Sequence, residues 1–201
     1  MMRPLVPAIL AMAATVLASN ILVQFLLGDW LTWGALTYPF AFLVTDVTNR
    51  VQGAVAARKV VIAGFVVGVL CSLTAAALDA TTLRIAVASG AAFLLAQLLD
   101  IRIFDRLRQR DWWQAPFLSS LVGSVLDTVL FFTIAFAAFL PADANTGWAN
   151  EAVPLLGVGP LAPLWASLAV ADWGVKLALA ALALVPFRMI VRKILLSPLR
   201  N

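Results

Sequence analysis

The chain has 201 residues, of which 63% are hydrophobic and only 12% are charged, and its mean hydropathy is +1.00. A soluble domain has about 25% charged residues, so this much apolar surface cannot all be buried in one core and calls for a lipid bilayer. Because the chain has no His and a single cysteine, Cys71, an internal disulfide and a His/Cys metal site are excluded, and we expect no metal and no cofactor.

Six apolar runs follow one another along the chain, and we expect each of them to form a transmembrane helix. Most approach the length of about 20 residues that a helix needs to cross about 30 Å of hydrocarbon, and the two-residue alternation of a transmembrane barrel is absent. The predicted fold is an all-α integral membrane protein, a bundle of six transmembrane helices in a single domain over residues 1–201. The runs cover residues 4–27, 31–48, 60–79, 83–101, 115–140 and 161–186.

The first run carries two amide side chains near its end. It is too long for the core of a typical signal peptide, and no small-residue cleavage site ends it, so we expect it to span the membrane. Asn20 and Gln24 lie one helical turn apart. Amides in membrane spans either bond a neighbouring helix or face a ligand, and both interpretations stay open here.

The second run places aromatic and acidic residues on one helical face. Tyr38, Phe42 and Asp46 follow one another at intervals of four residues and so share one side of a helix. Pro39 removes a backbone hydrogen bond and is expected to break the helix beside a cavity. Aromatic rings and a carboxylate on one face suit a planar heterocycle with N–H donors. In the alternative interpretation, Asp46 faces water at the cytoplasmic end or pairs with Arg50.

Small residues recur at intervals of four in the third and fourth runs. The pairs are Gly64 with Gly68 and Ala88 with Ala92, and such pairs let helix backbones approach closely. We expect them to pack inside the bundle, and a homodimer interface is the alternative.

The fourth run ends with two polar residues. Gln97 lies inside the run, where its amide either bonds a neighbouring helix or serves a ligand. Asp100 lies beside Arg102 at the cytoplasmic edge of the run, and we expect it to be solvated.

The fifth and sixth runs contain charges at membrane depth, where each costs roughly 2.5–3.5 kcal/mol on insertion scales. Asp127 has no cation within four residues of it, so it needs a partner on another helix, a bound ligand or a proton. Thr128 and Phe131 lie beside it on the same run. Asp172 and Lys176 form an i, i+4 pair that can neutralise itself. Alternatively, Lys176 reaches Asp127 and leaves Asp172 facing a cavity.

The basic residues predict the orientation of the chain in the membrane. They cluster before the first run, between runs two and three, between runs four and five, and after run six, whereas the other loops are mostly acidic. With six crossings, these clusters lie on one side, so both termini are expected in the cytoplasm. The excess of Lys and Arg is therefore topological, and we expect no nucleic-acid partner.

Motifs for the common enzyme chemistries are missing from the sequence. There is no G-x-x-x-x-G-K-[ST] phosphate loop, no G-x-S-x-G and no H-E-x-x-H. We therefore expect a transporter and not an enzyme.

Several stretches taken together resemble the bacterial queuosine precursor transporter family, which is also called vitamin-uptake-transporter-like. The resemblance implies an importer in the bacterial inner membrane that crosses it several times. The implied substrates are 7-cyano-7-deazaguanine and 7-aminomethyl-7-deazaguanine, salvaged for the queuosine modification of tRNA. The stretches are SNILVQ, TWGALTYPFAFLVTDVTNRVQG, LAQLLDIRIFDRLRQ, SSLVG, DTVLFFTIAF and ADWGVK.

The resemblance also implies a substrate site built from residues of several runs. We expect Asp127 or Asp46 to accept the two adjacent N–H donors of the guanine-like edge, because bidentate charge-assisted bonds orient a ligand strongly. Amide side chains would form hydrogen bonds with the other polar atoms of the ligand, and aromatic rings would stack on its flat face. The predicted site residues are Asn20, Gln24, Tyr38, Phe40, Phe42, Asp46, Gln97, Asp127, Thr128, Asp172 and Lys176.

A second interpretation keeps the binding role and changes the class of protein. The chain would then be the substrate-capture subunit of a vitamin or nucleobase uptake system that a separate ATPase module energises. Transport by the purified chain without ATP distinguishes the two interpretations.

Overall fold

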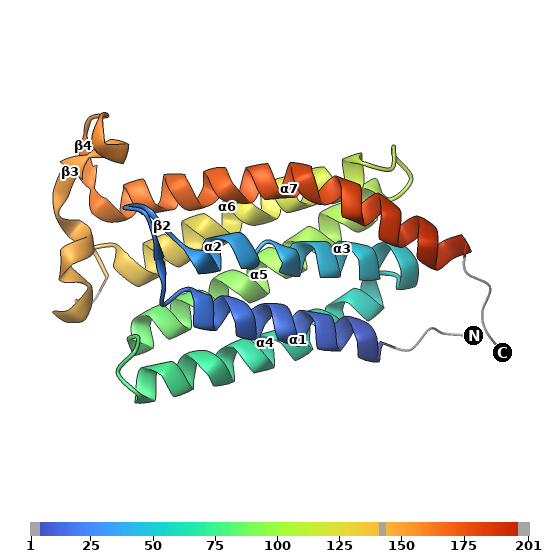
Figure 1. The fold of residues 1–201 in the computed structure, drawn as a ribbon, viewed down its shortest axis with the longest axis horizontal. Helices are drawn as coiled ribbons and strands as arrows, with labels where there is room; N and C mark the ends of the chain where they lie inside the picture. The colour runs from blue at the N-terminus through green and yellow to red at the C-terminus, as the bar shows by residue number, and fades with distance from the viewer. Residues whose placement is uncertain (1–4, 141–143, 197–201) are drawn as a thin grey trace.

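The computed structural model describes residues 5–140 and 144–196, and over these ranges the chain is a bundle of α-helices with two short hairpins at one end (Figure 1). The helices are α1 (Val6–Leu22), α2 (Trp33–Thr37), α3 (Phe40–Gln52), α4 (Ala54–Ala77), α5 (Leu83–Leu107), α6 (Gln114–Phe136) and α7 (Leu164–Leu196). The strands are β1 (Leu26–Leu27), β2 (Leu31–Thr32), β3 (Ala152–Pro154) and β4 (Leu161–Pro163), and the 3-10 helices are η1 (Ala144–Asn150) and η2 (Leu155–Gly157).

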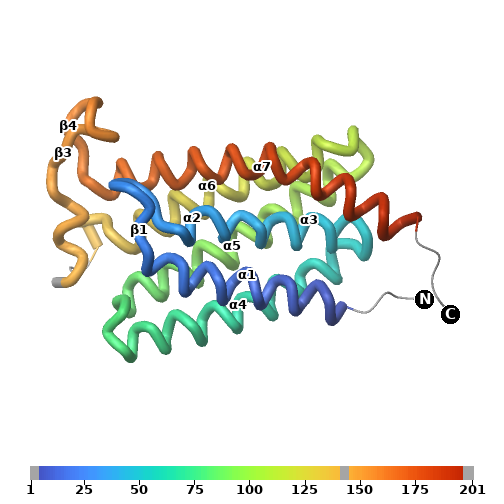
Figure 2. The backbone as a smooth tube through the Cα atoms, viewed as in Figure 1, coloured from blue at the N-terminus to red at the C-terminus, as the bar shows by residue number. Residues whose placement is uncertain are grey.

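The helices run along the long axis of the bundle and reverse direction from one to the next, except that α3 continues in the direction of α2 (Figure 2). The start of α1 and the end of α7 therefore lie together, at what we call the terminal end of the bundle. The antiparallel hairpins β1–β2 and β3–β4 lie at the opposite end, which we call the hairpin end.

The predicted all-α membrane protein is confirmed. Among the described residues, α4, α5, α6 and α7 are long and apolar enough to cross a membrane, and α1 is a shorter apolar helix of 17 residues. The second predicted run is divided between α2 and α3.

Proline breaks the second run where the sequence predicts a break. Helix α2 ends at Thr37, and α3 begins at Phe40, directly after Pro39. The turn between them is held by short-range bonds, from the Ala41 N–H to the Tyr38 carbonyl at 3.0 Å and from the Phe42 N–H to the Pro39 carbonyl at 3.1 Å. Tyr38 is thereby placed at the end of a short half-helix.

A glycine reverses the chain between α3 and α4. Gly53 has φ +88°, a left-handed conformation that is strained for residues with a Cβ atom. The two helices consequently meet with a single residue between them at the terminal end.

Several helix ends differ from the predicted runs. Helix α4 begins at Ala54 and not at residue 60, α5 ends at Leu107 and not at residue 101, and α6 ends at Phe136 and not at residue 140. Helix α1 stops at Leu22 and not at residue 27, because the following residues turn and form the β1–β2 hairpin. Helix α7 continues beyond residue 186 although Pro186 removes a backbone donor. Phe187 and Val191 lie past this proline and still pack in a buried cluster, which stabilises the helix there.

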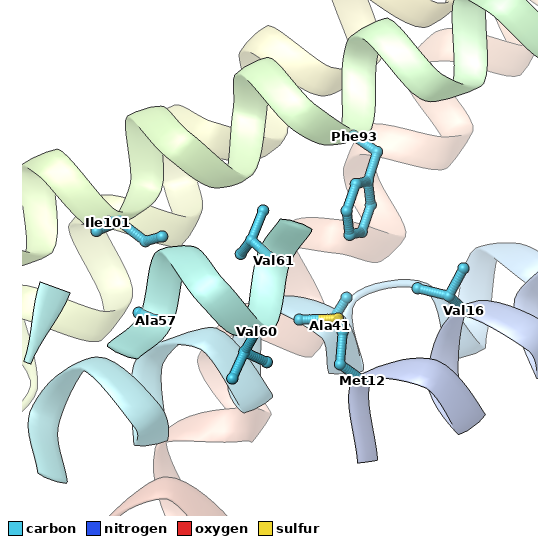
Figure 3. Close-up of a cluster of buried hydrophobic side chains, with 8 residues drawn as sticks. All are labelled: Met12, Val16, Ala41, Ala57, Val60, Val61, Phe93 and Ile101. Atoms are coloured by element: carbon cyan, nitrogen blue, oxygen red, sulfur yellow. The ribbon is translucent and has the colours of Figure 1, made fainter. Parts of the chain in front are cut away.

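The small residues of α4 pack against α1. A Cβ atom on Gly64 would lie 2.5 Å from Cγ of Met12, and one on Gly68 would lie 3.2 Å from Cγ1 of Val16. Figure 3 shows Met12 and Val16 in the same buried cluster as Val60 and Val61 of α4. The spacing of the glycines is therefore explained by packing inside the bundle.

Candidate functional site

Helices α6 and α7 bring three charged side chains together inside the bundle. The Nζ atom of Lys176 donates to Oδ2 of Asp127 at 2.7 Å and also to Oδ2 of Asp172. Lys176 and Asp127 are almost wholly buried, whereas the Asp172 side chain is 16% exposed. Both interpretations of Lys176 from the sequence therefore hold at once, because it bonds the neighbouring acid on its own helix and the distant acid on α6.

Two hydroxyl groups complete this charged cluster. The Tyr38 hydroxyl donates to Oδ1 of Asp127 at 3.0 Å, and the Thr128 hydroxyl donates to Oδ2 of Asp172 at 3.0 Å. The ammonium of Lys176 also lies 5.5 Å from the centre of the Tyr38 ring, within the range of a cation–π interaction. We call Tyr38, Asp127, Thr128, Asp172 and Lys176 the charged cage.

The charged cage borders a large cavity of about 460 Å³ that lies toward the hairpin end. Ligand cavities in proteins typically measure about 300–1,000 Å³. The walls come from the end of α1, the β1–β2 hairpin, α2, the α4–α5 loop, α5, α6, η1 and α7. Four members of the cage, Tyr38, Asp127, Asp172 and Lys176, line the cavity, and Thr128 supports them from beside it.

Aromatic rings form one side of the cavity. Phe131, Phe132 and Phe136 of α6 line it together with Tyr38. The rings of Phe131 and Phe132 meet edge to face with their centres 5.1 Å apart, a favourable aromatic geometry. These three phenylalanines were not among the predicted site residues, although Phe131 lies one helical turn beyond Asp127 and so shares its face.

The two predicted amides of the first run both line the cavity, in different ways. Asn20 donates to the Val16 carbonyl at 2.9 Å and accepts from the Ser72 hydroxyl at 3.1 Å, so it ties α1 to α4. Gln24 lies in the turn after α1 and is exposed at the rim of the cavity.

The remaining predicted site residues lie outside this cavity. Phe40 is 49% exposed. Phe42 packs closely on α6, where a Cβ atom at Gly123 would lie 2.9 Å from its ring. Gln97 is buried and accepts a hydrogen bond from the Thr45 hydroxyl at 2.6 Å. The structure therefore divides the predicted set between the cavity and deeper layers of the bundle.

Asp46 belongs to a second polar layer, nearer the terminal end. Its two carboxylate oxygens accept hydrogen bonds from the hydroxyls of Ser119 at 3.4 Å and Ser120 at 3.2 Å. A void of about 20 Å³, lined by both Asp46 and Lys176, lies between this layer and the charged cage.

The expectation that Asp100 is solvated is wrong. Its side chain is fully buried, because it lies on the face of α5 that packs against Gly123 of α6. Arg102, its neighbour in sequence, is exposed. Proximity along the chain did not reveal that the two side chains leave the helix on different sides.

Arginine side chains close the bundle beyond the second layer. The Arg108 guanidinium donates to the Asn49 carbonyl at 2.7 Å, and Arg50 donates in return to the Arg108 carbonyl at 2.8 Å. Both guanidinium groups lie over the ring of Phe104, at 5.9 and 5.4 Å from its centre. These contacts join the ends of α3 and α5.

In the part of the chain that the structure describes, no group of three or more His, Cys, Asp or Glu side chains could hold a metal ion.

Comparison with known proteins supplies the family. Residues 32–191 match the family model described as putative vitamin uptake transporter. The chain is 37% identical over 185 residues to the probable queuosine precursor transporter of Haemophilus influenzae, and the match covers 84% of this chain and 72% of that relative.

Two further relatives match over shorter stretches. The chain is 42% identical over 138 residues to the queuosine precursor transporter of Escherichia coli, and 31% identical over 141 residues to the probable queuosine precursor transporter of Bacillus subtilis. Each match covers 59% of this chain and 62% of the relative, so the chain spans somewhat less than two thirds of these two proteins. No solved structure matches the chain.

Proposed function

Since this chain belongs to the queuosine precursor transporter family, we propose that it imports 7-cyano-7-deazaguanine, 7-aminomethyl-7-deazaguanine or both across the bacterial inner membrane, for salvage into queuosine in tRNA. Its relatives are transporters, so the prediction that it is not an enzyme is confirmed. The observation that carries the proposal is the cavity of about 460 Å³ bordered by the charged cage.

The charges of the cage suit the guanine-like edge of the precursors. With all groups ionised, the two carboxylates and one ammonium carry a formal charge of −1. Asp172 keeps contact with the cavity through its partly exposed side chain, and carboxylates accept bidentate bonds from adjacent N–H donors. Asp172 and Asp127 are therefore the acceptors that we assign to the precursor. An adenine-like edge lacks the two adjacent N–H donors, so it forms no bidentate bond with a carboxylate of the cage, and a site that depends on such bonds rejects it strongly.

The aromatic lining of the cavity suits a flat ligand. Phe131, Phe132 and Tyr38 line the cavity together with Asp127 and Asp172, and stacked aromatic pairs contribute roughly 0.5–1.5 kcal/mol beyond their buried area. The deazaguanine ring lies against these side chains with its polar edge toward the cage.

The charge distribution along the bundle supports an orientation of the chain that suits import. We assign six crossings, made by α1, the α2–α3 pair, α4, α5, α6 and α7. Basic residues of α3, α4, α5 and α7 cluster at the terminal end, which the preference of Lys and Arg for the cytoplasm places inside the cell. Arg84 lies at the hairpin end and bonds the Ile134 and Ala137 carbonyls at the end of α6. The cavity lies toward the outer side, as an importer that is ready to take up its substrate requires.

Uptake in cells unable to make 7-cyano-7-deazaguanine tests the function. Cells that express this chain should accumulate the labelled precursor and restore queuosine in tRNA. Asp127→Asn should lower uptake about 10- to 100-fold, because a hydrogen bond to a charged group contributes about 1.5–3 kcal/mol. Asp111→Asn, at an exposed acid in the α5–α6 connection, is the matched control. Normal uptake by Asp127→Asn at equal expression would contradict the assigned site.

The capture-subunit interpretation finds no support in the three relatives. Transport by the purified chain in liposomes without ATP is the expected result, and a strict requirement for an added ATPase would reverse this choice.

A further inference from the structure

The second polar layer contains two carboxyl groups that no cation neutralises. Asp46 is buried and accepts two hydrogen bonds, from Ser119 and Ser120. Asp100 is fully buried, and its carboxyl lies beside Asp46 and the same two serines. Neither oxygen of Asp100 has a hydrogen-bond partner among the described residues. A buried, unpartnered carboxyl is thus directed at a second buried carboxyl.

The cations near this pair of carboxyl groups interact with other groups. Arg50, on the same helix as Asp46, donates to the Arg108 carbonyl and lies over the Phe104 ring. Lys176 of α7 shares the small void with Asp46, but its ammonium bonds Asp127, Asp172 and Thr128. Within residues 5–140 and 144–196, neither Asp46 nor Asp100 forms an ion pair, and the facing side chains of α6 are neutral serines.

Two neighbouring carboxylates without a cation cannot both stay ionised in a buried site. Loss of one charge removes the repulsion between them, and the added O–H supplies the donor that Asp100 lacks. We propose that Asp46 and Asp100 share one proton, and that this pair is the proton-binding site of the transporter.

The void between the two layers gives the proton a route to the cavity. Its volume of about 20 Å³ is enough for one water molecule, which needs roughly 10–15 Å³ on this measure. Lys176 and Asp46 both line it, so one water there reaches from the charged cage to the acid pair. In the coupled cycle, a proton from the outer side binds a carboxylate oxygen of the pair. The proton then leaves this oxygen toward the inner side, and it moves inward together with the precursor. This coupling rests on the proposed transport function, whereas the shared proton does not.

Infrared spectroscopy of the purified protein near neutral pH tests the shared proton directly. The C=O stretch of a protonated carboxyl group is resolved from the bands of ionised carboxylates. We expect this band in the unchanged protein and in Asp111→Asn, and its loss in both Asp46→Asn and Asp100→Asn, since either amide replaces the shared proton with its own N–H donor. Absence of the band from the unchanged protein, or its survival in either variant, would overturn the proposal. If one variant cannot be purified, the other carries the same test.

Transport into liposomes tests the coupling separately. With an acidic exterior, the unchanged protein and Asp111→Asn should concentrate labelled 7-cyano-7-deazaguanine, whereas Asp100→Asn should only exchange it across the membrane. Accumulation by Asp100→Asn at the normal level would refute coupling through this pair. Loss of exchange in both Asp46→Asn and Asp100→Asn would also refute the proposed coupling, because the two carboxyl groups would then be needed to move the substrate itself. Absence of exchange of both 7-cyano-7-deazaguanine and 7-aminomethyl-7-deazaguanine by the unchanged protein would contradict the proposed function and leave the infrared result standing.

Discussion

At the scale of single residues, Lys176 connects the parts of the candidate site. It is the cation of the charged cage, it lies by the Tyr38 ring, and it lines both the large cavity and the small void. A buried ammonium held by two carboxylates makes each charge depend on the others, since removal of one partner leaves an uncompensated charge in a medium of low dielectric constant.

Substitution of Lys176 should therefore destabilise the protein. Lys176→Met keeps a long apolar side chain and removes the charge, and we expect a loss of about 3–5 kcal/mol in the free energy of unfolding. Thermal unfolding in detergent measures it, with the exposed Lys59→Met in α4 as the control. Equal unfolding temperatures for the two variants would show that the cage is not held together by Lys176.

The sequence singled out most polar residues of the site but not their partners. Asp127 and Lys176 are 49 positions apart, and hydropathy does not say which helices are neighbours, so the two alternatives for Lys176 could not be separated. Asp46 was interpreted as facing a ligand, or else as facing water or pairing with Arg50, and the sequence did not indicate its layer with Ser119 and Ser120. The burial of Asp100 depends on which face of α5 meets α6, and the apolar residues on all sides of a membrane helix conceal that face.

At the scale of elements, close helix contacts and one broken helix place the site. Helix α1 lies against α4 through Gly64 and Gly68, and the break at Pro39 leaves Tyr38 beside Asp127. The break was predictable because proline acts through local chemistry. The end of α1 was not, because the residues after Leu22 are as apolar as a span and yet form the β1–β2 hairpin.

Two glycines on different helices should respond in opposite ways to alanine. Gly64→Ala places a methyl group 2.5 Å from Cγ of Met12, whose side chain is fully buried, so we expect a loss of about 1–3 kcal/mol from overpacking. Gly174→Ala meets no atom within 4 Å and should gain up to about 1 kcal/mol from helix propensity. Unfolding temperatures in detergent distinguish them. A Gly64→Ala protein as stable as Gly174→Ala would contradict the tight contact between α1 and α4.

At the scale of the whole molecule, polar layers follow one another along the bundle between two unlike ends. The cavity lies toward the hairpin end, the charged cage and the Asp46–Asp100 layer come next, and the arginines over Phe104 close the terminal end. The distribution of basic residues along the sequence predicts this polarity, because it depends only on the order of the loops. A cavity near Pro39 was expected, but its extent could not be predicted, since it is formed by side chains from both halves of the chain.

Chemical labelling tests the proposed orientation. In a Cys71→Ser background, Val158→Cys and Arg110→Cys place one thiol at each end of the bundle, at positions that are exposed. A maleimide that cannot cross membranes should label Val158→Cys in intact spheroplasts, and Arg110→Cys only after the membrane is opened. The reverse pattern would invert the topology and turn the cavity toward the cytoplasm.

The most direct measurement is the thermal stability of the purified protein across a panel of 7-deazaguanines, guanine, adenine and vitamins. A ligand at about 100 times its dissociation constant stabilises the folded state by about 2.7 kcal/mol. We expect such a shift with 7-cyano-7-deazaguanine or 7-aminomethyl-7-deazaguanine, no shift with adenine, and a strongly reduced shift in Asp127→Asn. Stabilisation by a vitamin but by neither deazaguanine, or an undiminished shift in Asp127→Asn, would contradict the assignment of the charged cage as the site that binds the precursors.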